Sequence, residues 1–281
     1  MNNINSIKTK INNKAKKHNL SPQDLMQMYF FERILYRISI SKYKYNFIIK
    51  GGLLLSSMFE DESRTTQDLD TMIKGIEISE EKLREVLTSI FEIDANDDIK
   101  FEIVNFKSIR DEDLYGGYRV SLKVKLDTLN VNLKIDITTG DPIVPSEIEY
   151  NYKCLIEDKN IKIMAFSKYS IIAEKFETLI ETLETDTRAK DFYDIYKLTN
   201  EELEDDKLYK AIYNTFKRRN KLELLDDLED RYRVIKSSLA LREYWNNYQR
   251  KHYYAKDISY EEFVDSINNI IKIIESIKQP V

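Results

Sequence analysis

The chain has 281 residues and a formal net charge of −5, with 44 Lys and Arg against 49 Asp and Glu. This balance argues against a uniformly basic nucleic-acid-binding protein. The single cysteine, Cys154, excludes an intrachain disulfide and a cysteine metal cluster, and two histidines far apart in sequence argue against a zinc site. No apolar signal segment opens the chain, and no run approaches the roughly 20 apolar residues of a membrane span. We therefore expect a cytoplasmic protein with no membrane contact.

The first predicted elements are two helices. Residues 5–18 have the composition of a basic helix. Ser21 followed by Pro22 is a helix start, with Ser as the N-cap and Pro at the first helical position. The second helix should pack against a sheet through an apolar stripe at helical spacing. This stripe consists of Leu25, Met28, Phe31, Leu35 and Ile38.

A strand, a tight turn and a helix start follow. The apolar run Phe47 to Ile49 stops at Lys50 and the pair Gly51-Gly52, and residues 53–59 have the composition of a buried helix. Such a helix start leaves backbone N–H groups available for phosphate oxygens. The sequence therefore predicts a phosphate-binding turn here.

Two carboxylates come next, in the strand-like run of residues 68–74. Asp68 and Asp70 are two residues apart, so the period of a strand places both on one face. Like charges held this close repel each other unless a cation lies between them. Mg²⁺ meets that need when it also binds substrate phosphates.

Ser79 begins a predicted helix that ends near Phe91, and residues 94–98 form an acidic loop. From residue 99 the apolar period becomes two. Residues 120–126 and 129–137 alternate about a turn at 127–128, which predicts an antiparallel hairpin with one buried and one wet face. Asp136 belongs to the wet face. It can be a functional carboxylate, or an ordinary exposed Asp paired with Lys134 or Lys125.

Short strands are expected at residues 147–152 and 161–165, and the remainder reads as helical. The first of these helices has a stripe of Ile172, Phe176, Leu179 and Leu183, with Lys175 at its border. Lys175 either has a function or pairs with the neighbouring Glu174 or Glu177. In the next helix, predicted over 187–198, Arg188, Asp191 and Asp194 share a face, and simple ion pairing is the alternative to function. The fold class is α+β, with an α/β lobe over 1–165 and a helical lobe over 166–281.

The segment 207–256 is the richest candidate for an RNA contact. It has 13 Lys or Arg against six Asp or Glu, and tyrosines and the single Trp are interleaved with them. Phosphate neutralisation and base stacking use such residues. The alternative is a solvated helix face with tyrosines at its edges.

The ordered set of motifs resembles a known family. Lys50-Gly51-Gly52, Arg64 and Asp68-Leu69-Asp70, followed by Lys175 and Arg188-x-x-Asp191-x-x-Asp194, are similar to the AbiEii toxins of bacterial type IV toxin–antitoxin, abortive infection systems and to the related MenT toxins. These toxins belong to the DNA polymerase β-like nucleotidyltransferases. The resemblance covers about residues 45 to 200. The superfamily often has Ser in place of Gly52, so a hydroxyl contact to the triphosphate is either lost or supplied by Ser56 or Ser57. The loop from 59 to 67 is slightly longer than the superfamily norm.

The resemblance implies a Mg²⁺-dependent nucleotidyltransferase with one or two ions and an NTP substrate. It also implies an RNA acceptor, the 3′ end of tRNA, and a cognate antitoxin encoded nearby. Blocking that end would stop translation in a phage-infected cell. It leaves open whether Asp191 or Asp194 is the functional acid. Rival functions are transfer to a protein or small molecule, a phosphotransferase, and a non-catalytic nucleotide-binding scaffold. The implied metal ligands are Asp68, Asp70 and Asp136, and the implied nucleotide-binding residues are Lys50, Gly51, Gly52, Ser56, Arg64, Lys175 and Arg188.

Overall fold

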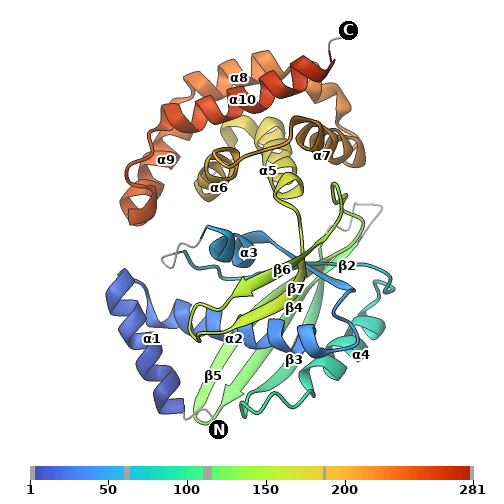
Figure 1. Ribbon diagram of the computed structural model, residues 1–281, viewed down its shortest axis with the longest axis vertical. Coiled ribbons are helices and arrows are strands. Elements are labelled where there is room, and N and C mark those ends of the chain that lie inside the picture. Colours follow the sequence, from blue (N-terminus) through green and yellow to red (C-terminus); the bar gives the residue numbers. More distant parts are fainter. Residues whose placement is uncertain (1–3, 60–63, 110–115, 186–187, 279–281) are drawn as a thin grey trace. The chain divides into compact units, whose positions relative to one another are not determined.

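The computed structural model describes residues 4–59, 64–109, 116–185 and 188–278 (Figure 1). The chain divides into two compact units. The first consists of Met1–Gly140 and Glu147–Ala165, and the second of Asp141–Ser146 and Phe166–Val281. None of the helices in the described part of the chain is long and apolar enough to cross a membrane.

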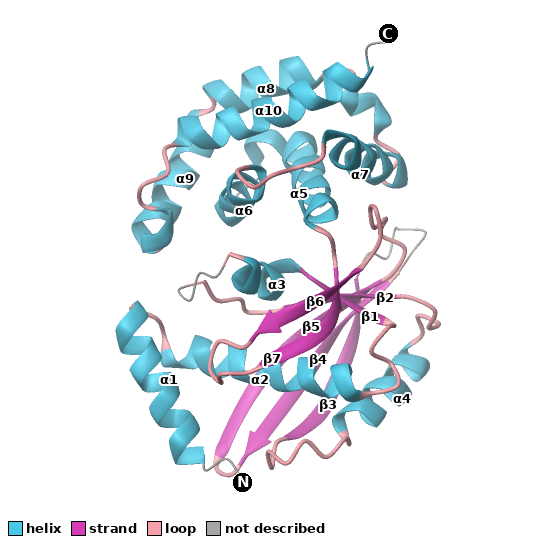
Figure 2. Ribbon diagram, viewed as in Figure 1, coloured by secondary structure: helices cyan, strands magenta, loops and turns pink. Residues whose placement is uncertain are grey.

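The first unit is built on a seven-stranded mixed sheet with the strand order β3-β4-β5-β2-β1-β7-β6 (Figure 2). β2 is parallel to β5 and β1 is parallel to β7, while the other neighbouring pairs are antiparallel. The predicted mixed sheet of an α+β fold is confirmed. The strands are β1 (Phe47–Lys50), β2 (Leu69–Ile73), β3 (Lys100–Ile109), β4 (Gly117–Leu126), β5 (Leu129–Thr138), β6 (Ile148–Lys153) and β7 (Asn160–Ala165).

The predicted hairpin is formed by β4 and β5. Pairing is unbroken from Leu126 opposite Leu129, next to the turn, to Gly117 opposite Thr138 at the far end. Most apolar residues of the alternating pattern are buried, although Leu129 and Val131 next to the turn are half-buried, and the polar residues between them are half-buried or exposed. This alternation fixes the register, because a shift by one residue would move the apolar set to the wet face.

Four helices belong to the first unit: α1 (Ile4–His18), α2 (Pro22–Ile40), α3 (Gly51–Met58) and α4 (Glu80–Phe91). The predicted N-cap at Ser21 and the predicted helix start at Ser79 are confirmed, and both hydroxyls accept from backbone N–H groups at the starts of α2 and α4. α2 packs on β7, and α4 packs on β3, where the rings of Phe91 and Phe101 stack at 5.1 Å. α3 packs on β1, β2 and β6.

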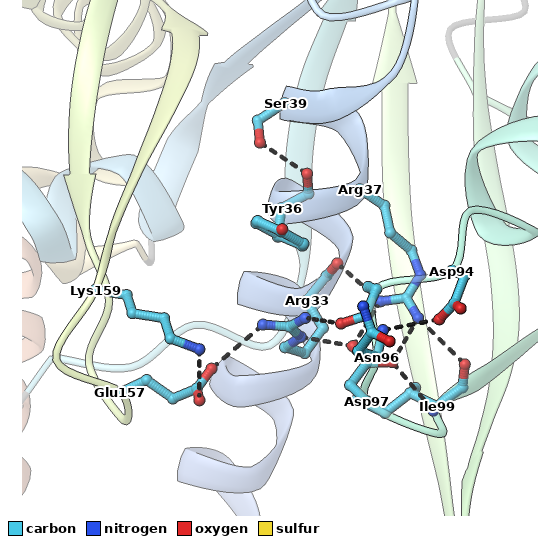
Figure 3. A network of polar contacts seen from close by, with 11 residues as sticks. Arg33, Tyr36, Arg37, Ser39, Asp94, Asn96, Asp97, Ile99, Glu157 and Lys159 are labelled. Atoms are coloured by element: carbon cyan, nitrogen blue, oxygen red, sulfur yellow. Dashed lines mark hydrogen bonds and ion pairs between the residues drawn. The ribbon is translucent and has the colours of Figure 1, made fainter. Parts of the chain in front are cut away.

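A buried ion-pair network ties α2 to two loops of the first unit (Figure 3). Arg37 donates to both carboxylate oxygens of Asp97, at 2.8 and 2.6 Å, and Arg33 Nε donates to Asp97 at 2.7 Å. Arg33 Nη1 also donates to Glu157 at 3.3 Å. Burial would raise the pKa of Asp97, but the two guanidinium groups hold it below its usual value. The acidic segment 94–98 is the predicted loop, yet Asp97 is a buried anchor rather than an exposed charge.

The second unit is helical, as predicted. Phe176 packs near Phe216, and the rings of Phe192 and Phe263 stack at 4.5 Å in its core. Leu183 was expected on the stripe of the first helix, but it lies just beyond the end of α5 with a φ of 47°. The helices are α5 (Lys168–Thr182), α6 (Ala189–Thr199), α7 (Asp205–Arg218), α8 (Leu228–Ser237), α9 (Leu239–Lys251) and α10 (Tyr260–Lys278), with short 3-10 helices at Leu183–Thr185, Leu222–Leu225 and Tyr253–Ala255.

Candidate active site

The start of α3 lies directly against Asp70. β1 ends at Lys50 and α3 begins at the next residue, Gly51, whose φ is +68°. A Cβ atom on Gly51 would lie only 1.9 Å from Oδ2 of Asp70. Glycine is therefore needed at this position for two reasons: the left-handed backbone conformation and the close approach of the Asp70 carboxylate. The result is an acidic side chain beside the first turn of a helix.

The second glycine makes room for the loop that carries Asp68. A Cβ atom on Gly52 would lie 2.7 Å from Oγ1 of Thr66. The Thr66 side chain is buried, and its hydroxyl donates to the backbone carbonyl of Asp68 at 3.2 Å. Thr66 thus occupies the space that a serine side chain at position 52 would need.

A row of charged residues crosses the sheet at this level. Lys50 on β1 is opposite Asp70 on β2, and Asp70 is opposite Asp136 on β5. Asp136 is in turn opposite Arg119 on β4, and Arg119 is opposite Lys107 on β3. Registered residues of neighbouring strands face the same side of a sheet. The pairing therefore brings the carboxylates of Asp70 and Asp136 together on one face.

Asp136 is held by Arg119. Nε of Arg119 donates to Oδ1 of Asp136 at 2.8 Å, and Nη2 donates to Oδ2 at 2.6 Å. These hydrogen bonds, together with the negative charges of Asp136, Asp68 and Asp70, raise the pKa of Arg119. The partner is neither Lys134 nor Lys125, the two considered from the sequence. Lys125 instead pairs with Glu102 at 2.8 Å.

The acidic residues fit a magnesium ion that is also bound to phosphate. Among the described residues, no three acidic, histidine or cysteine side chains form a complete metal cage. Mg²⁺ does not require one, because it usually keeps several waters and is bound by one or two carboxylates and substrate phosphates. The adjacent pair Asp70 and Asp136, with Asp68 two residues before Asp70, offers oxygen ligands of the right type.

The other predicted residues of the first unit have different surroundings. Lys50 is buried at the end of β1. Arg64 is buried, and its guanidinium carbon lies 5.6 Å from the centre of the Phe59 ring. The Ser56 hydroxyl is buried and donates to the carbonyl of Leu53 at 2.8 Å. Because Ser56 lies more than one helical turn beyond Gly51, the structure places its hydroxyl away from the start of α3.

In the second unit, α5 and α6 bring Lys175 to two buried carboxylates. Its Nζ is 3.0 Å from Oδ2 of Asp194, and it also forms an ion pair with Asp191. Arg188 Nε lies 3.7 Å from Oδ2 of Asp191. Burial would raise the pKa of Asp191, but Lys175 holds it below its ordinary value. Both candidate acids thus contact Lys175, whereas Glu177 pairs with Arg219 and Lys221.

The model of the nucleotidyl transferase AbiEii toxin family, from type IV toxin–antitoxin systems, matches residues 33–266. The chain belongs to the AbiEii family. The match spans residues of both units, including Asp70, Asp136 and Lys175. The protein is therefore a nucleotidyltransferase toxin of a type IV toxin–antitoxin system by family, which implies an NTP substrate and a cognate antitoxin.

Two crystal structures are similar to this AbiEii family member over most of the chain. A provisionally assigned nucleotidyltransferase from H. pylori is 18% identical with a TM-score of 0.49, over 93% of this chain and 100% of that one. JHP933 from Helicobacter pylori is 18% identical with a TM-score of 0.48, over 92% of this chain and 95% of that one. No curated protein matches the sequence significantly.

Sequence reasoning missed two residues of this AbiEii site. Arg119 could have been found, because a two-residue turn after Leu126 pairs it with Asp136 by counting along both strands. Thr66 carried no signal in the sequence, because its contact with Gly52 depends on how the loop returns to the sheet.

Proposed function

We propose that this AbiEii protein transfers a nucleotidyl group from an NTP to the 3′ end of an RNA, with tRNA as the acceptor, in the cytoplasm. The observation that carries the proposal is the position of Asp70. Its carboxylate packs against Gly51 at the start of α3 and is in register with Asp136. A helix start that can bind phosphate and a carboxylate pair that can bind a metal therefore lie side by side, which supports a site for a nucleotide with its metal.

Each residue has a proposed role. The backbone N–H groups of Gly51 and Gly52 bind the β- and γ-phosphates, and Lys50 and Arg64 add positive charge at that end of α3. Asp68, Asp70 and Asp136 would hold one or two Mg²⁺ ions, and the metal would supply positive charge that neutralises the developing charge and lowers the pKa of the attacking hydroxyl. The acceptor oxygen forms a bond to the α-phosphorus, and pyrophosphate leaves.

The cluster around Lys175 in the second unit is proposed to bind phosphate oxygens of the NTP. Two buried carboxylates, Asp191 and Asp194, hold its ammonium group in place, and Arg188 adds a second cation at Asp191. A lysine fixed in this way loses less side-chain entropy when it contacts a phosphate than a mobile one. Asp191 and Asp194 then act together as the residues that position Lys175.

The basic segment 207–256 is a weaker RNA surface than its composition indicates. Many of its cations have partners inside the second unit: Arg219 and Lys221 pair with Glu177, Arg233 pairs with Asp230, Arg242 pairs with Glu261, and Arg231 donates to the carbonyl of Ile180. Trp245 is buried, and its Nε1 donates to the carbonyl of Ile258. These contacts support the alternative of an internally paired helical surface.

Incubation with each NTP labelled at the α-phosphorus, Mg²⁺, and either total RNA or total protein tests the proposal. Label should enter RNA of tRNA size, and the Asp70→Asn variant should give none. Label in protein or in a small product would replace the proposed acceptor. A parallel incubation uses NTPs labelled at the γ-phosphorus. Transfer of label from the γ position but not from the α position would indicate a phosphotransferase, and nucleotide binding without transfer from either position would indicate a scaffold.

Toxicity offers a second test. Expression in a bacterium should arrest growth, and Asp68→Ala should relieve the arrest at equal protein levels. A cognate antitoxin encoded nearby is proposed to act as a repressor, without a need to bind the toxin. Normal growth with confirmed soluble wild-type protein would favour transfer to a small molecule.

A further inference from the structure

The sheet face that carries Asp70 and Asp136 continues beyond them as a polar surface over β5, β4 and β3. Stepping two residues along β5 from Asp136 leads to Lys134 and then Asn132, which are opposite Ser121 and Lys123 on β4. These residues share the face of Asp136 because the register of the hairpin has no break. We call this surface the polar face; it consists of Lys107, Arg119, Ser121, Lys123, Asn132 and Lys134.

The polar face carries positive charge that the described residues around it neutralise only in part, at Lys123. Lys107 and Lys134 are exposed, and Lys123 is half-buried. Glu102 on β3 is opposite Lys123 and attracts its charge, although its hydrogen-bonded partner is Lys125 at 2.8 Å. Lys107 and Lys134 form no ion pair within the described part of the chain. The chain as a whole carries a net charge of −5. A polyanion should therefore be attracted to this local surface rather than to the molecule in general.

The position of the polar face relative to the phosphate-binding end of α3 indicates which substrate it meets. The start of α3 lies against Asp70, whereas the polar face begins on the far side of Asp136, at Arg119. In phosphoryl transfer the attacking and leaving oxygens are roughly in line. If pyrophosphate leaves toward α3, the acceptor hydroxyl arrives from the side of the polar face.

We propose that the polar face binds the 3′-terminal single-stranded segment of the RNA acceptor through its phosphates. This inference rests on the proposed nucleotidyl transfer to RNA and adds the surface that holds the acceptor. Lys107, Lys123 and Lys134 neutralise phosphates, and Ser121 and Asn132 supply hydrogen bonds. Arg119, which is paired with Asp136, contacts the RNA phosphate nearest to Asp70 and Asp136.

The size of the polar face suits a short RNA end. Arg119 and Lys123 are four residues apart on one strand, which is about 13 Å at ~3.4 Å per residue. This length matches roughly four stacked nucleotides at ~3.4 Å each. A hollow of about 510 Å³ is lined by Asp68 together with Ser121, Asn132 and Lys134, and ligand sites typically measure ~300–1,000 Å³. The six residues include no aromatic side chain, so we expect phosphate contacts with little base preference.

Helix α1 provides a matched control. Lys10, Lys16 and Lys17 are exposed on the same unit, but α1 packs on α2 and is not part of the sheet. Changing three lysines to glutamine alters the net charge equally on either surface. Only the polar face is in register with the carboxylate pair.

The experiment measures binding of a fluorescent single-stranded RNA oligonucleotide by anisotropy over a range of salt concentrations. The variants are Lys107→Gln/Lys123→Gln/Lys134→Gln and, as the control, Lys10→Gln/Lys16→Gln/Lys17→Gln. We expect the first variant to bind RNA at least about tenfold more weakly and to flatten the slope of log affinity against log salt by about 2, from ~0.7 for each lost contact. NTP affinity should be unchanged, and the control should match the wild type.

An unchanged slope in the first variant, or an equal loss in both, would overturn the assignment of the polar face. Labelling of RNA by the wild-type protein is measured in parallel. If RNA is labelled but the polar-face variant binds and labels it normally, only the location of the acceptor is wrong. If RNA binding depends on the polar face but no RNA is labelled, the proposed transfer reaction is wrong and the binding surface stands.

Discussion

Replacing Gly51 by alanine should show how the position of the Asp70 carboxylate affects the rate of transfer, separately from any effect on the stability of the fold. The new Cβ would lie 1.9 Å from Oδ2 of Asp70, so the carboxylate or the start of α3 must move by about 1 Å to restore a contact of roughly 3 Å. A misplacement of about 1 Å at a reacting centre can lower the rate by ~100-fold. The positive φ of Gly51 adds about 1–2 kcal/mol of backbone strain for any residue with a Cβ.

Gly75→Ala is the control for the cost of placing a residue with a Cβ at a positive φ. Gly75 also has a positive φ, +72°, but its added Cβ would meet only Nδ2 of Asn46, at an ordinary 3.5 Å. Both variants should therefore lose about 1–2 kcal/mol, or roughly 2–8 °C in melting temperature. Steady-state nucleotidyl transfer should fall by about two orders of magnitude in Gly51→Ala only. Equal activities in the two variants at equal stability would refute the role given to the contact between Gly51 and Asp70.

Three further predictions concern single side chains. Asp70→Asn should abolish transfer and leave the melting temperature within a few degrees; full activity would remove the metal-site proposal. Lys175→Met should weaken NTP binding in calorimetry and cost about 3–5 kcal/mol of unfolding free energy, because two buried carboxylates lose their shared cation. The control Glu174→Ala should have neither effect. Similar losses from both variants would indicate general damage to α5. Burial raises the pKa of Glu32 to about 8 from an ordinary 4.5, so the folded unit binds a proton that the unfolded chain releases, and its stability should fall as the pH rises through this window. Glu32→Gln keeps an acceptor for the N–H of Leu155 and should remove that fall in a series of melts from pH 5 to 8.5; an identical pH dependence in both proteins would show that Glu32 is ionised throughout.

Local signals in the sequence predicted the elements of the fold well. Ser21 and Ser79 mark helix starts by a capping interaction that depends on the next few residues only, and the structure shows both caps. The alternation in residues 120–137 defines the hairpin and its register. Asp136 was correctly placed on the wet face of the hairpin, and the same register would have named Arg119 as its partner.

Contacts between distant segments could not be predicted in this way. Asp97 lies in a loop whose charges suggest exposure, and only the packing of α2 reveals that it binds Arg33 and Arg37. Likewise, composition alone made the segment 207–256 look like an RNA surface. Glu177 was seen as a neighbour of Lys175, although it is 42 residues from Arg219, the cation it binds.

The division of the chain into units has a consequence for its synthesis. The segment Asp141–Ser146 belongs to the second unit but is made before β6 and β7, which complete the sheet of the first. The backbone N–H of Val144 in this segment donates to Ser170 on α5, at 2.8 Å. Because α5 is synthesised after β6 and β7, the sheet of the first unit can form before this hydrogen bond does. A fragment that begins at residue 166 would lack this contact. A C-terminal fragment expressed from residue 166 should therefore lack the packing and hydrogen bond that residues 141–146 provide. In a split protein, both fragments would need to contain a copy of residues 141–146.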